Sequence, residues 1–321
     1  MSGGGSYHPN QDQLAIAGAI DDALVELLPI ARLHQSHEET AGVWAELDAL
    51  GSFGVSLPED SGGSGLGIAE EALIVMSLGR RLASPTVLAT VAAARAVPAE
   101  LRSGPAGTVR VAAAYRRGDQ IVMVGDADAK LMLLRDGDKA ALYRAAAPNS
   151  ELDSRNWLAR LQGVNSLGEP LARFDAAGLL RLRLIDAAAL AGVAQAALEM
   201  AVEYAQMREQ FGRPIGSQQA IKHHCANMAI QARCARDQVN FAAVALEQDR
   251  ADAELSVESA LLVAGTAAIE NAGKNIQIHG GIGFSDEADP HLLVKRAQLL
   301  TAIAGGLEAA TDRLGALPSV Q

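Results

Sequence analysis

Hydrophobic residues are spaced differently in three parts of the chain. In residues 11–105, and again from residue 186 onward, apolar residues recur every three to four positions, as on one face of an α-helix. In residues 106–185 the apolar runs are short or alternate with polar residues, as in β-strands. The pattern predicts a flexible segment 1–10, an N-terminal helical domain 11–105, a small β domain 106–185 and a C-terminal helical bundle 186–321.

The first helical domain is predicted to hold three or more helices, three of them at residues 14–33, 40–50 and 68–82. Residues 51–67 separate the last two and contain too many glycines for a helix. This connection does not follow a strand and lacks the lysine of a P-loop. We therefore interpret it as an ordered link between helices and not as a phosphate-binding loop.

Six strands are predicted in the β domain, at residues 109–115, 120–124, 130–134, 140–144, 158–162 and 179–184. Residues 116–119 and 135–138 each combine charged side chains with a glycine, which suits a tight hairpin turn.

The last part of the chain is predicted to begin with Asp186 as a helix N-cap. Helices are predicted at residues 190–207, 217–246, 253–273 and 290–315. Long antiparallel helices with short connections form a four-helix bundle.

Composition agrees with a mainly helical protein. Of the 321 residues, 49% are hydrophobic but only 3% are aromatic, so Ala, Leu, Val and Ile must build the core, as in close-packed helices. The formal net charge of −11 disfavours a general nucleic-acid or anionic-membrane surface, because such binding needs a basic face. An anionic ligand would have to meet local arginines.

Nothing in the sequence suggests a metal site, secretion or a membrane span. Cys225 and Cys234 lie within one helical pattern without metal-ligand spacing, and the adjacent His223 and His224 cannot share a helix face. Residues 1–6 lack the basic and apolar regions of a signal peptide, and charged residues interrupt the apolar helices. We expect a cytoplasmic protein.

Two segments at the edges of the long helical patterns carry candidate chemistry. Residues 208–215 read REQFGRPI, and residues 277–284 read QIHGGIGF. Each combines polar side chains, an aromatic residue and glycine. A guanidinium can bind phosphate oxygens with two parallel hydrogen bonds, and backbone at paired glycines can approach a pyrophosphate closely. The two segments together suit a dinucleotide.

The order of domains and these motifs resemble the acyl-CoA dehydrogenase family of flavoproteins across most of the chain. In the first domain the resemblance rests on residues 44–47 (WAEL), 53–55 (FGV), 58–59 (PE), 62–65 (GGSG) and 78–80 (LGR). In the bundle it rests on residues 208–215, with Gln219, and on residues 277–284. The resemblance implies a fold with an N-terminal helical domain, a shortened middle β domain and a C-terminal four-helix bundle.

In this family each FAD site is built from two subunits, so the resemblance implies that this chain contributes the ADP half of a neighbour's site. Arg208 would pair with the pyrophosphate, and Gln210 and Phe211 would contact the cofactor beside it. On the other side the cofactor would meet three residues: Gln277, Gly280 and Gly281.

The family's catalytic base is absent from both places where the resemblance puts it. Family members remove an α-proton with a glutamate, and the two matching positions here are Gly305 and Thr266. Neither residue can take a proton at neutral pH. Glu308 and Glu270 follow these positions by about one helical turn, a displacement of roughly 4.5 to 6 Å along a helix axis. We interpret them as surface or interface charges.

The β domain also departs from the family. Catalytic members carry a Thr-Glu-Pro-x-Ala-Gly-Ser-Asp type stretch and a following Ile-Thr strand that hold the flavin. Here residues 111–118 lead directly into a hairpin, and no such stretch occurs in the domain. The chain thus keeps the half-site that it would donate and lacks the half-site that it would use itself.

Three functions fit these observations. The first is a non-catalytic subunit that resembles the short subunit of heteromeric, two-plus-two acyl-CoA dehydrogenases of steroid side-chain degradation. It would share FAD with a full-length catalytic subunit acting on an acyl-CoA, with an electron-transfer flavoprotein as acceptor. The second is a homo-oligomeric dehydrogenase with Glu270 or Glu308 as a relocated base, and the third is a flavin-free scaffold. The sequence does not specify the acyl group.

Overall fold

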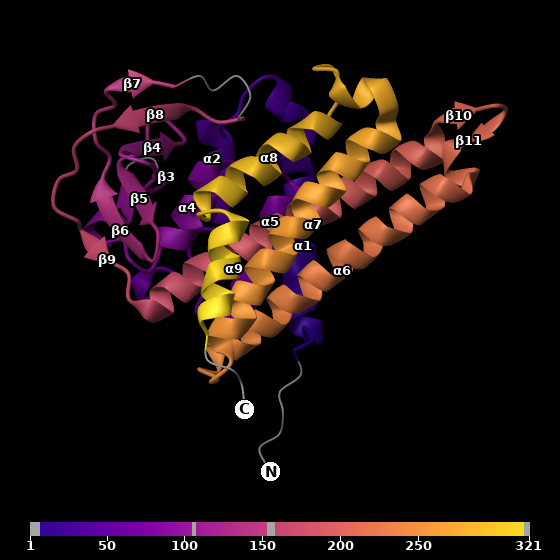
Figure 1. Ribbon diagram of the computed structural model, residues 1–321. Coiled ribbons are helices and arrows are strands. Elements are labelled where there is room, and N and C mark those ends of the chain that lie inside the picture. Colours follow the sequence, from indigo (N-terminus) through magenta and orange to yellow (C-terminus); the bar gives the residue numbers. More distant parts are fainter. Residues whose placement is uncertain (1–6, 105–106, 153–157, 318–321) are drawn as a thin grey trace, which may run out of the picture.

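The computed structural model describes residues 7–104, 107–152 and 158–317 (Figure 1). The flexible segment predicted at the N-terminus therefore lies partly outside the described residues. The α-helices are α1 Gln11–Leu27, α2 Ala41–Ala49, α3 Ile68–Arg80, α4 Pro85–Ala93, α5 Ala176–Met207, α6 Gln219–Glu247, α7 Ala253–His279, α8 Pro290–Ile303 and α9 Leu307–Ala316. Short 3-10 turns are η1 Ile30–His34, η2 Glu59–Ser61, η3 Ala99–Leu101, η4 Ile215–Ser217 and η5 Gly280–Phe284.

The strands are β1 Ser103–Gly104, β2 Gly107–Thr108, β3 Val111–Arg117, β4 Gln120–Val124, β5 Leu131–Asp136, β6 Lys139–Arg144, β7 Ser150–Glu151, β8 Leu161–Val164, β9 Ala172–Arg173, β10 Glu209–Gln210 and β11 Arg213–Pro214. Seven of them form one sheet in the order β7-β8-β4-β3-β5-β6-β9. β3 and β5 are parallel, and the other neighbours are antiparallel.

The first helical domain follows the sequence pattern closely. Thr40 caps α2 by accepting a hydrogen bond from the backbone of Val43. The predicted helices 40–50 and 68–82 are confirmed as α2 and α3. The helix predicted over 14–33 is divided, because Pro29 separates α1 from η1. α4 is an additional helix, and all nine of its residues are buried, so it shows no amphipathic period.

Both hairpin turns of the β domain are confirmed. Gly118 and Gly137, with φ of 59° and 60°, lie at the turns between β3 and β4 and between β5 and β6. The strand predicted over residues 179–184 is wrong, because this segment belongs to α5. Its alternating leucines and arginines imitate a strand, but Arg181 is buried in an ion pair with Glu71 and therefore acts as an interior residue.

The N-cap of α5 is Asp175, which accepts a 2.8 Å hydrogen bond from the backbone of Gly178. The prediction of Asp186 as the N-cap is wrong, since Asp186 lies inside the helix, is buried and pairs with Arg135. α5 is also long and apolar enough to cross a membrane by length and composition, which the sequence pattern did not indicate. In the structure 72% of that window is buried, as expected for the core helix of a folded domain.

α5, α6, α7 and α8 pack together as the predicted bundle beside the β domain, and α9 packs on α7 (Figure 1). α7 extends to His279, beyond the predicted end at residue 273. The single helix predicted over 290–315 is wrong, because Gly305 and Gly306 have φ of 94° and 89° and separate α8 from α9. A positive φ is unfavourable for residues other than glycine, and it ends a right-handed helix.

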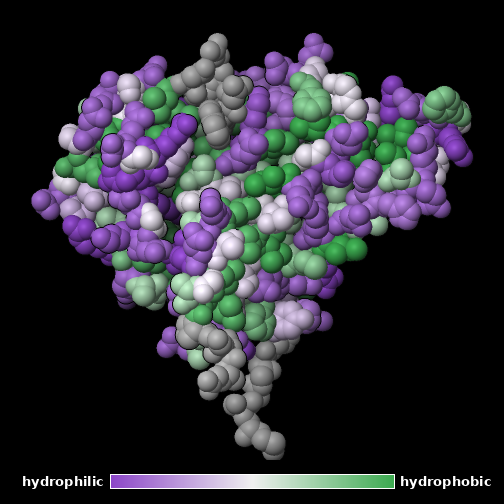
Figure 2. All heavy atoms as spheres, in the orientation of Figure 1, coloured by the Kyte–Doolittle hydropathy of each residue, from purple (hydrophilic) through white to green (hydrophobic). Residues whose placement is uncertain are grey.

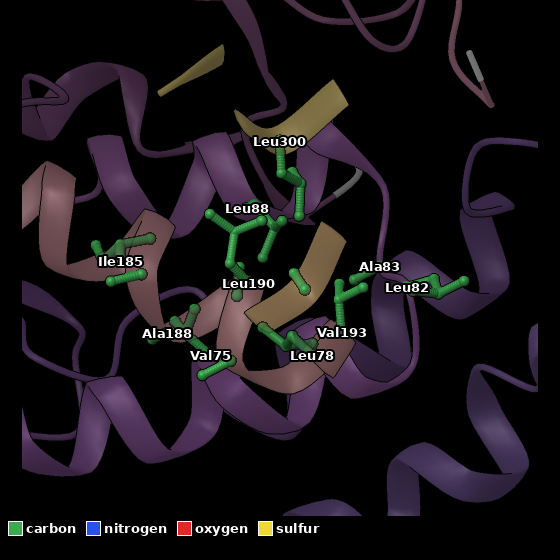
Figure 3. Close-up of a cluster of buried hydrophobic side chains, with 14 of the residues drawn as sticks. Val75, Leu78, Leu82, Ala83, Leu88, Ile185, Ala188, Leu190, Val193 and Leu300 are labelled. Carbon is green, nitrogen blue, oxygen red and sulfur yellow. The ribbon is translucent and has the colours of Figure 1, made fainter. Parts of the chain in front are cut away.

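The core joins the N-terminal domain to the bundle. Figure 3 shows Leu78 of α3, Leu88 of α4, Leu190 of α5 and Leu300 of α8 in one buried cluster. Gly79 lies so close to α5 that an added Cβ would come within 2.1 Å of the carbonyl oxygen of Ala189. α3 and α5 therefore pack backbone against backbone, which fixes the first domain on the bundle.

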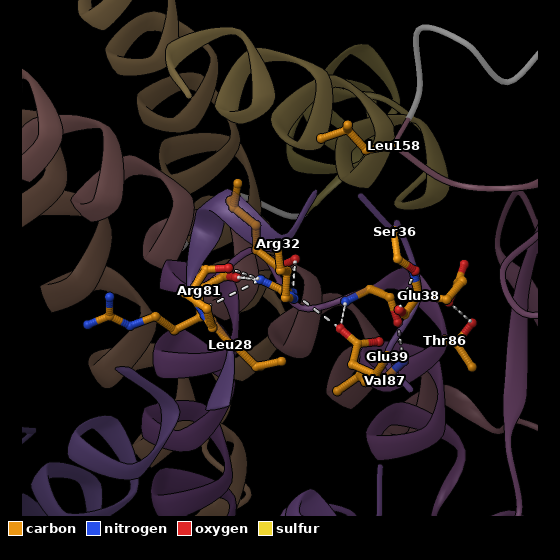
Figure 4. Close-up of polar contacts among 12 residues, drawn as sticks. Leu28, Arg32, Ser36, Glu38, Glu39, Arg81, Thr86, Val87 and Leu158 are labelled. Atoms are coloured by element: carbon orange, nitrogen blue, oxygen red, sulfur yellow. Dashed lines mark hydrogen bonds and ion pairs between the residues drawn. The ribbon is translucent and has the colours of Figure 1, made fainter. Parts of the chain in front are cut away.

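A polar cluster lies in the link between η1 and α2 (Figure 4). The Arg32 guanidinium donates to the carbonyl oxygens of Arg81 and Leu82, at 2.9 and 3.0 Å, and pairs with Glu39 at 3.2 Å. Beside it, Glu38 accepts a 3.1 Å hydrogen bond from Thr86, and burial raises the pKa of Glu38 to about 7. The cluster ties the link to the end of α3 and the start of α4.

Candidate functional site

The first candidate segment forms the turn that follows α5. The backbone N–H of Arg208 still donates to the carbonyl oxygen of Tyr204, and the carbonyl oxygen of Arg208 accepts from Ile215, both at 2.8 Å. Between these contacts β10 and β11 form a short hairpin. Phe211 and Gly212 lie at its turn, with φ of 54° and 75°. The backbone thus holds Arg208 at the base of a hairpin that projects beyond the bundle (Figure 1).

The side chains of this hairpin are exposed to solvent. Phe211 is 94% exposed, which leaves its ring accessible to a molecule outside the chain. Arg208 and Gln210 are also exposed. In the part of the chain that the structure describes, no carboxylate pairs with Arg208. Its guanidinium is therefore available to an external anion.

The second candidate segment is the turn after α7. Gly280 and Gly281 are exposed, Gly280 has φ of 66°, and an added Cβ on either would meet no atom within 4 Å. Gly283 differs, because its Cβ would come within 2.8 Å of the carbonyl oxygen of Ile276. Gly283 serves the packing of the turn, whereas the backbone of the first two glycines is open to a ligand. Gln277, on the last turn of α7, is exposed beside them.

An aromatic stack joins the two segments. The rings of Tyr204, one turn before Arg208, and His279, next to Gly280, lie 4.0 Å apart between centroids at an interplanar angle of 22°. Nδ1 of His279 lies 2.9 Å from the carbonyl oxygen of Asn275, which fixes the ring. Burial lowers the pKa of His279, which favours the neutral form of the stacked ring. The structure thereby brings the Arg208 and Gly280 segments to one end of the bundle.

We call this region the bundle tip; it comprises residues 207–214, 277 and 280–284. Its exposed large apolar side chains are Met207, Phe211, Ile282 and Phe284. In the space-filling view, apolar groups stand among hydrophilic ones near the projecting hairpin (Figure 2). An unpaired arginine, open glycine backbone and exposed apolar groups fit the phosphates and rings of a dinucleotide. As an open surface, the tip would contact only one side of such a ligand.

A different cavity lies beside Gly305, between the β domain and the bundle. We call it the interdomain pocket. It has a volume of about 490 Å³, and its walls are the β3–β4 and β5–β6 hairpin turns, the first half of α5 and the junction of α8 with α9. Six cationic side chains line it: Arg116, Arg117, Arg135, Lys139, Arg183 and Arg313. Among the described residues that line it there is no Asp or Glu.

Two arginines of this pocket are held side by side by shared carboxylates. Oε1 of the buried Glu258 accepts from Arg183 at 2.6 Å and from Arg313 at 2.9 Å. Oδ1 of Asp138 lies 2.8 Å from Arg183 and 3.8 Å from Arg313. The network leaves no signature in the sequence, because its members are far apart in the chain and carry no local motif.

The structure separates the residues considered for a catalytic base. Gly305 lines the interdomain pocket, whereas Thr266 is half-buried in the middle of α7 and does not line it. Glu270 is exposed and bonds to Gln231 of α6. Glu308 is exposed in the first turn of α9, and the glycine break places it on a different helix from the one assumed. Neither glutamate lines the pocket beside Gly305.

Two family models match the chain. Residues 10–105 match the model described as acyl-CoA dehydrogenase, N-terminal domain. Residues 173–316 match the model described as acyl-CoA dehydrogenase, C-terminal domain. The bundle tip lies within the second match.

Individual proteins agree with the family models. The chain is 33% identical over 256 residues to acyl-CoA dehydrogenase IpdE2 of Mycobacterium tuberculosis, covering 78% of each. Its fold matches the ChsE4–ChsE5 complex of M. tuberculosis with a TM-score of 0.73 at 23% identity, covering 98% of this chain and 100% of the matched one. It also matches a variant of the Tcur3481–Tcur3483 steroid ACAD with a TM-score of 0.72 at 24% identity, covering 95% and 97%.

Proposed function

The chain belongs to the acyl-CoA dehydrogenase family, and we propose that it is the non-catalytic subunit of a heteromeric FAD enzyme. Membership of this family supports an oxidoreductase activity on CH–CH bonds. Within the proposed complex, the bundle tip supplies the ADP half of a FAD site whose remaining parts belong to a full-length catalytic subunit. The chain alone is inactive under this proposal.

One contrast carries the proposal. The bundle tip has open glycine backbone and an arginine that pairs with no carboxylate among the described residues, but it faces away from its own β domain (Figure 1). The pocket beside Gly305 has no carboxylate among its described lining residues. A chain that both held and oxidised its own substrate would need a desolvated carboxylate there. The open tip supports a role as a cofactor donor, and a described pocket lining without a carboxylate supports a non-catalytic chain.

Each tip residue has a role that follows from its chemistry. Arg208 would bind the pyrophosphate with two parallel hydrogen bonds, since its guanidinium is exposed and unpaired among the described residues. Gln210 and Phe211 would contact the cofactor beside it. Gln277 would donate from its amide, while Gly280 and Gly281 would let backbone approach the phosphates. Bound FAD supplies the hydride acceptor of the reaction.

The partner would supply the carboxylate that removes the α-proton of the acyl-CoA. The two matched structures named above support a heteromeric arrangement, since one is described as a ChsE4–ChsE5 complex and the other as a steroid ACAD of two named components. We extend this to a two-plus-two assembly acting on a steroid side-chain CoA thioester in the cytoplasm. An electron-transfer flavoprotein would reoxidise the flavin.

Expression of the chain alone and together with a full-length catalytic homologue tests this proposal. Alone, the purified chain should be colourless and inactive towards acyl-CoA. Together, the two chains should copurify, carry flavin absorbance and oxidise the thioester. A yellow, active homo-oligomer would contradict the proposal in favour of a relocated base, and a stable complex without flavin would favour a scaffold.

A further inference from the structure

We propose that the interdomain pocket binds a small dianion of the phosphate-monoester class between the Arg183–Arg313 pair and the hairpin-tip residues Arg117 and Lys139. This goes beyond the sharing of FAD, because the bundle tip and this pocket have no lining residue in common. Three features of the pocket carry the proposal: paired arginines, an excess of positive charge and an uncapped helix N-terminus.

Arg183 and Arg313 are held next to each other by a shared carboxylate. Glu258 is fully buried and its Oε1 accepts from both Arg183 and Arg313, so the two guanidiniums are fixed next to one another despite their mutual repulsion. Arg313 keeps one further buried nitrogen, Nη2, without a partner in the part of the chain described. Such a donor is costly to leave unsatisfied, and an anion beside it would remove that cost.

Positive charge exceeds negative charge around the pocket. Arg116 pairs with Asp136, Arg135 with Asp186, and the Arg183–Arg313 pair with Glu258 and Asp138. These contacts use four of the six cations. No carboxylate among the described residues pairs with Arg117 or Lys139, which leaves an excess of two charges.

Burial and the positive charge of Arg183 lower the pKa of Arg135 to about 10. Burial is the larger cause, and the repulsion between Arg183 and Arg135 adds to it. A ligand with two negative charges would balance the excess and relieve this repulsion.

Backbone dipoles add to this field. α9 begins at Leu307 with Gly306 as its N-cap, and no side chain caps it. Gly305, Gly306 and Ala309 all line the pocket, so the positive end of the ten-residue helix faces the cavity. With a volume of about 490 Å³ the pocket accommodates a phosphate together with a small organic group.

Phosphate binding can be measured without flavin or a partner. We suggest calorimetric titration of the full chain with inorganic phosphate, and separately with AMP, at constant ionic strength in chloride. The test variant is Arg117→Ala/Lys139→Ala, whose residues are exposed at hairpin turns and so leave the fold intact. The matched control is Lys130→Ala/Arg144→Ala, which removes the same charges from the opposite end of the β5–β6 hairpin.

Wild type and control should bind phosphate saturably with the same affinity within about twofold. The apparent Kd of the test variant should rise about 10- to 100-fold, as expected for two lost charge-assisted contacts. Tighter binding of inorganic phosphate than of AMP would identify the free ion as the ligand, and the reverse would identify a nucleotide-borne phosphate.

The proposal is overturned if wild type shows no saturable heat above the chloride background, or if the control weakens binding as much as the test variant does. Because no flavin takes part, failure here leaves the proposed FAD sharing untouched. Conversely, a complex without flavin would not affect phosphate binding by this pocket.

Discussion

Gly280–Gly281 and Gly305–Gly306 both end a helix of the C-terminal bundle, and they lie in different surroundings. The first pair follows α7 on an exposed tip, near Arg208, and its backbone faces open space. The second pair separates α8 from α9 and lines a pocket with six cationic side chains. At the tip, Gly280 and Gly281 have no side chains to cover the backbone, so it would be accessible to a ligand. At the break, glycine stands where the family resemblance places a carboxylate.

Under the proposed function, glycine has opposite consequences in the two regions. Gly280 and Gly281 would leave room for an external phosphate at the same end of the bundle as Arg208, which pairs with no carboxylate among the described residues. Gly305 would leave the interdomain pocket without the carboxylate that the family resemblance places there. Variants at and near the two regions should therefore separate cofactor retention from proton chemistry, and the following predictions use that separation.

The largest effect is expected for Arg208→Ala in a co-expressed complex. Loss of a charge-assisted contact leaves phosphate charge unpaired at an interface, which costs about 2 to 4 kcal/mol, or about 30- to 1000-fold in flavin affinity. Arg208→Lys should restore only part, because an ammonium lacks the planar geometry. Flavin dissociation rates measure this, with the exposed Arg144→Ala as a control that leaves them unchanged. Unaltered flavin retention in Arg208→Ala would remove the tip from the FAD site.

Glu38→Gln should alter the stability of the fold but not flavin binding, because Glu38 lies in neither the bundle tip nor the interdomain pocket. Its folded-state pKa is raised to about 7, so the folded chain binds more protons than the unfolded chain between about pH 4.5 and 7. The stability contributed by protonated Glu38 is present at low pH and is lost as pH rises through 7. Glu38→Gln should therefore be more stable than wild type by about 1 to 3 kcal/mol near pH 8, with a smaller gain near pH 6. Urea unfolding at both pH values tests the sign, and a wild type that gains stability from pH 6 to 8 relative to the variant would refute it.

Tyr204→Ala should loosen the tip. Its ring stacks on His279 and joins the two segments of the proposed half-site. Loss of a stacked pair costs about 0.5 to 1.5 kcal/mol, so flavin affinity should fall by roughly 2- to 10-fold if the stack positions both segments. Tyr204→Phe keeps the ring and should behave as wild type. Equal flavin retention in all three proteins would show that the segments are positioned without the stack.

The smallest effect is expected for Glu270→Gln and Glu308→Gln. Both glutamates are exposed, and neither lines the pocket beside Gly305. Turnover of the complex should change by less than about tenfold, or about 1.4 kcal/mol in the barrier. A true base would cost orders of magnitude more. A fall of that size with flavin content intact would identify the substituted glutamate as a relocated base.

Much of the fold could be predicted because local signals agreed with it. The family resemblance and the helix–sheet–bundle architecture are confirmed. The hairpin turns at Gly118 and Gly137 were predictable because only a few residue types tolerate positive φ. The errors arose where tertiary pairing overrides the local pattern. Arg181 looks like the polar face of a strand until its buried partner Glu71 is known.

The candidate site was predictable only in part. Arg208, Gln210, Phe211, Gln277, Gly280 and Gly281 were selected from two local motifs, and their roles stay predictions. The interdomain pocket could not be predicted, because Glu258 joins Arg183 and Arg313 across three different helices. A network of that kind depends on the packing of α5, α7 and α9 and leaves no short signature in the sequence.

The central claim is that this chain donates half of a flavin site and holds no flavin itself. The most direct test is the molar ratio of FAD to protein in the purified complex, from flavin absorbance and quantitative amino-acid analysis of each chain. If each flavin needs one donated half and one retained half, the complex should contain one FAD for each pair of unlike chains. A ratio of one FAD per chain would contradict the claim, because this chain's own β domain would then have to hold a flavin.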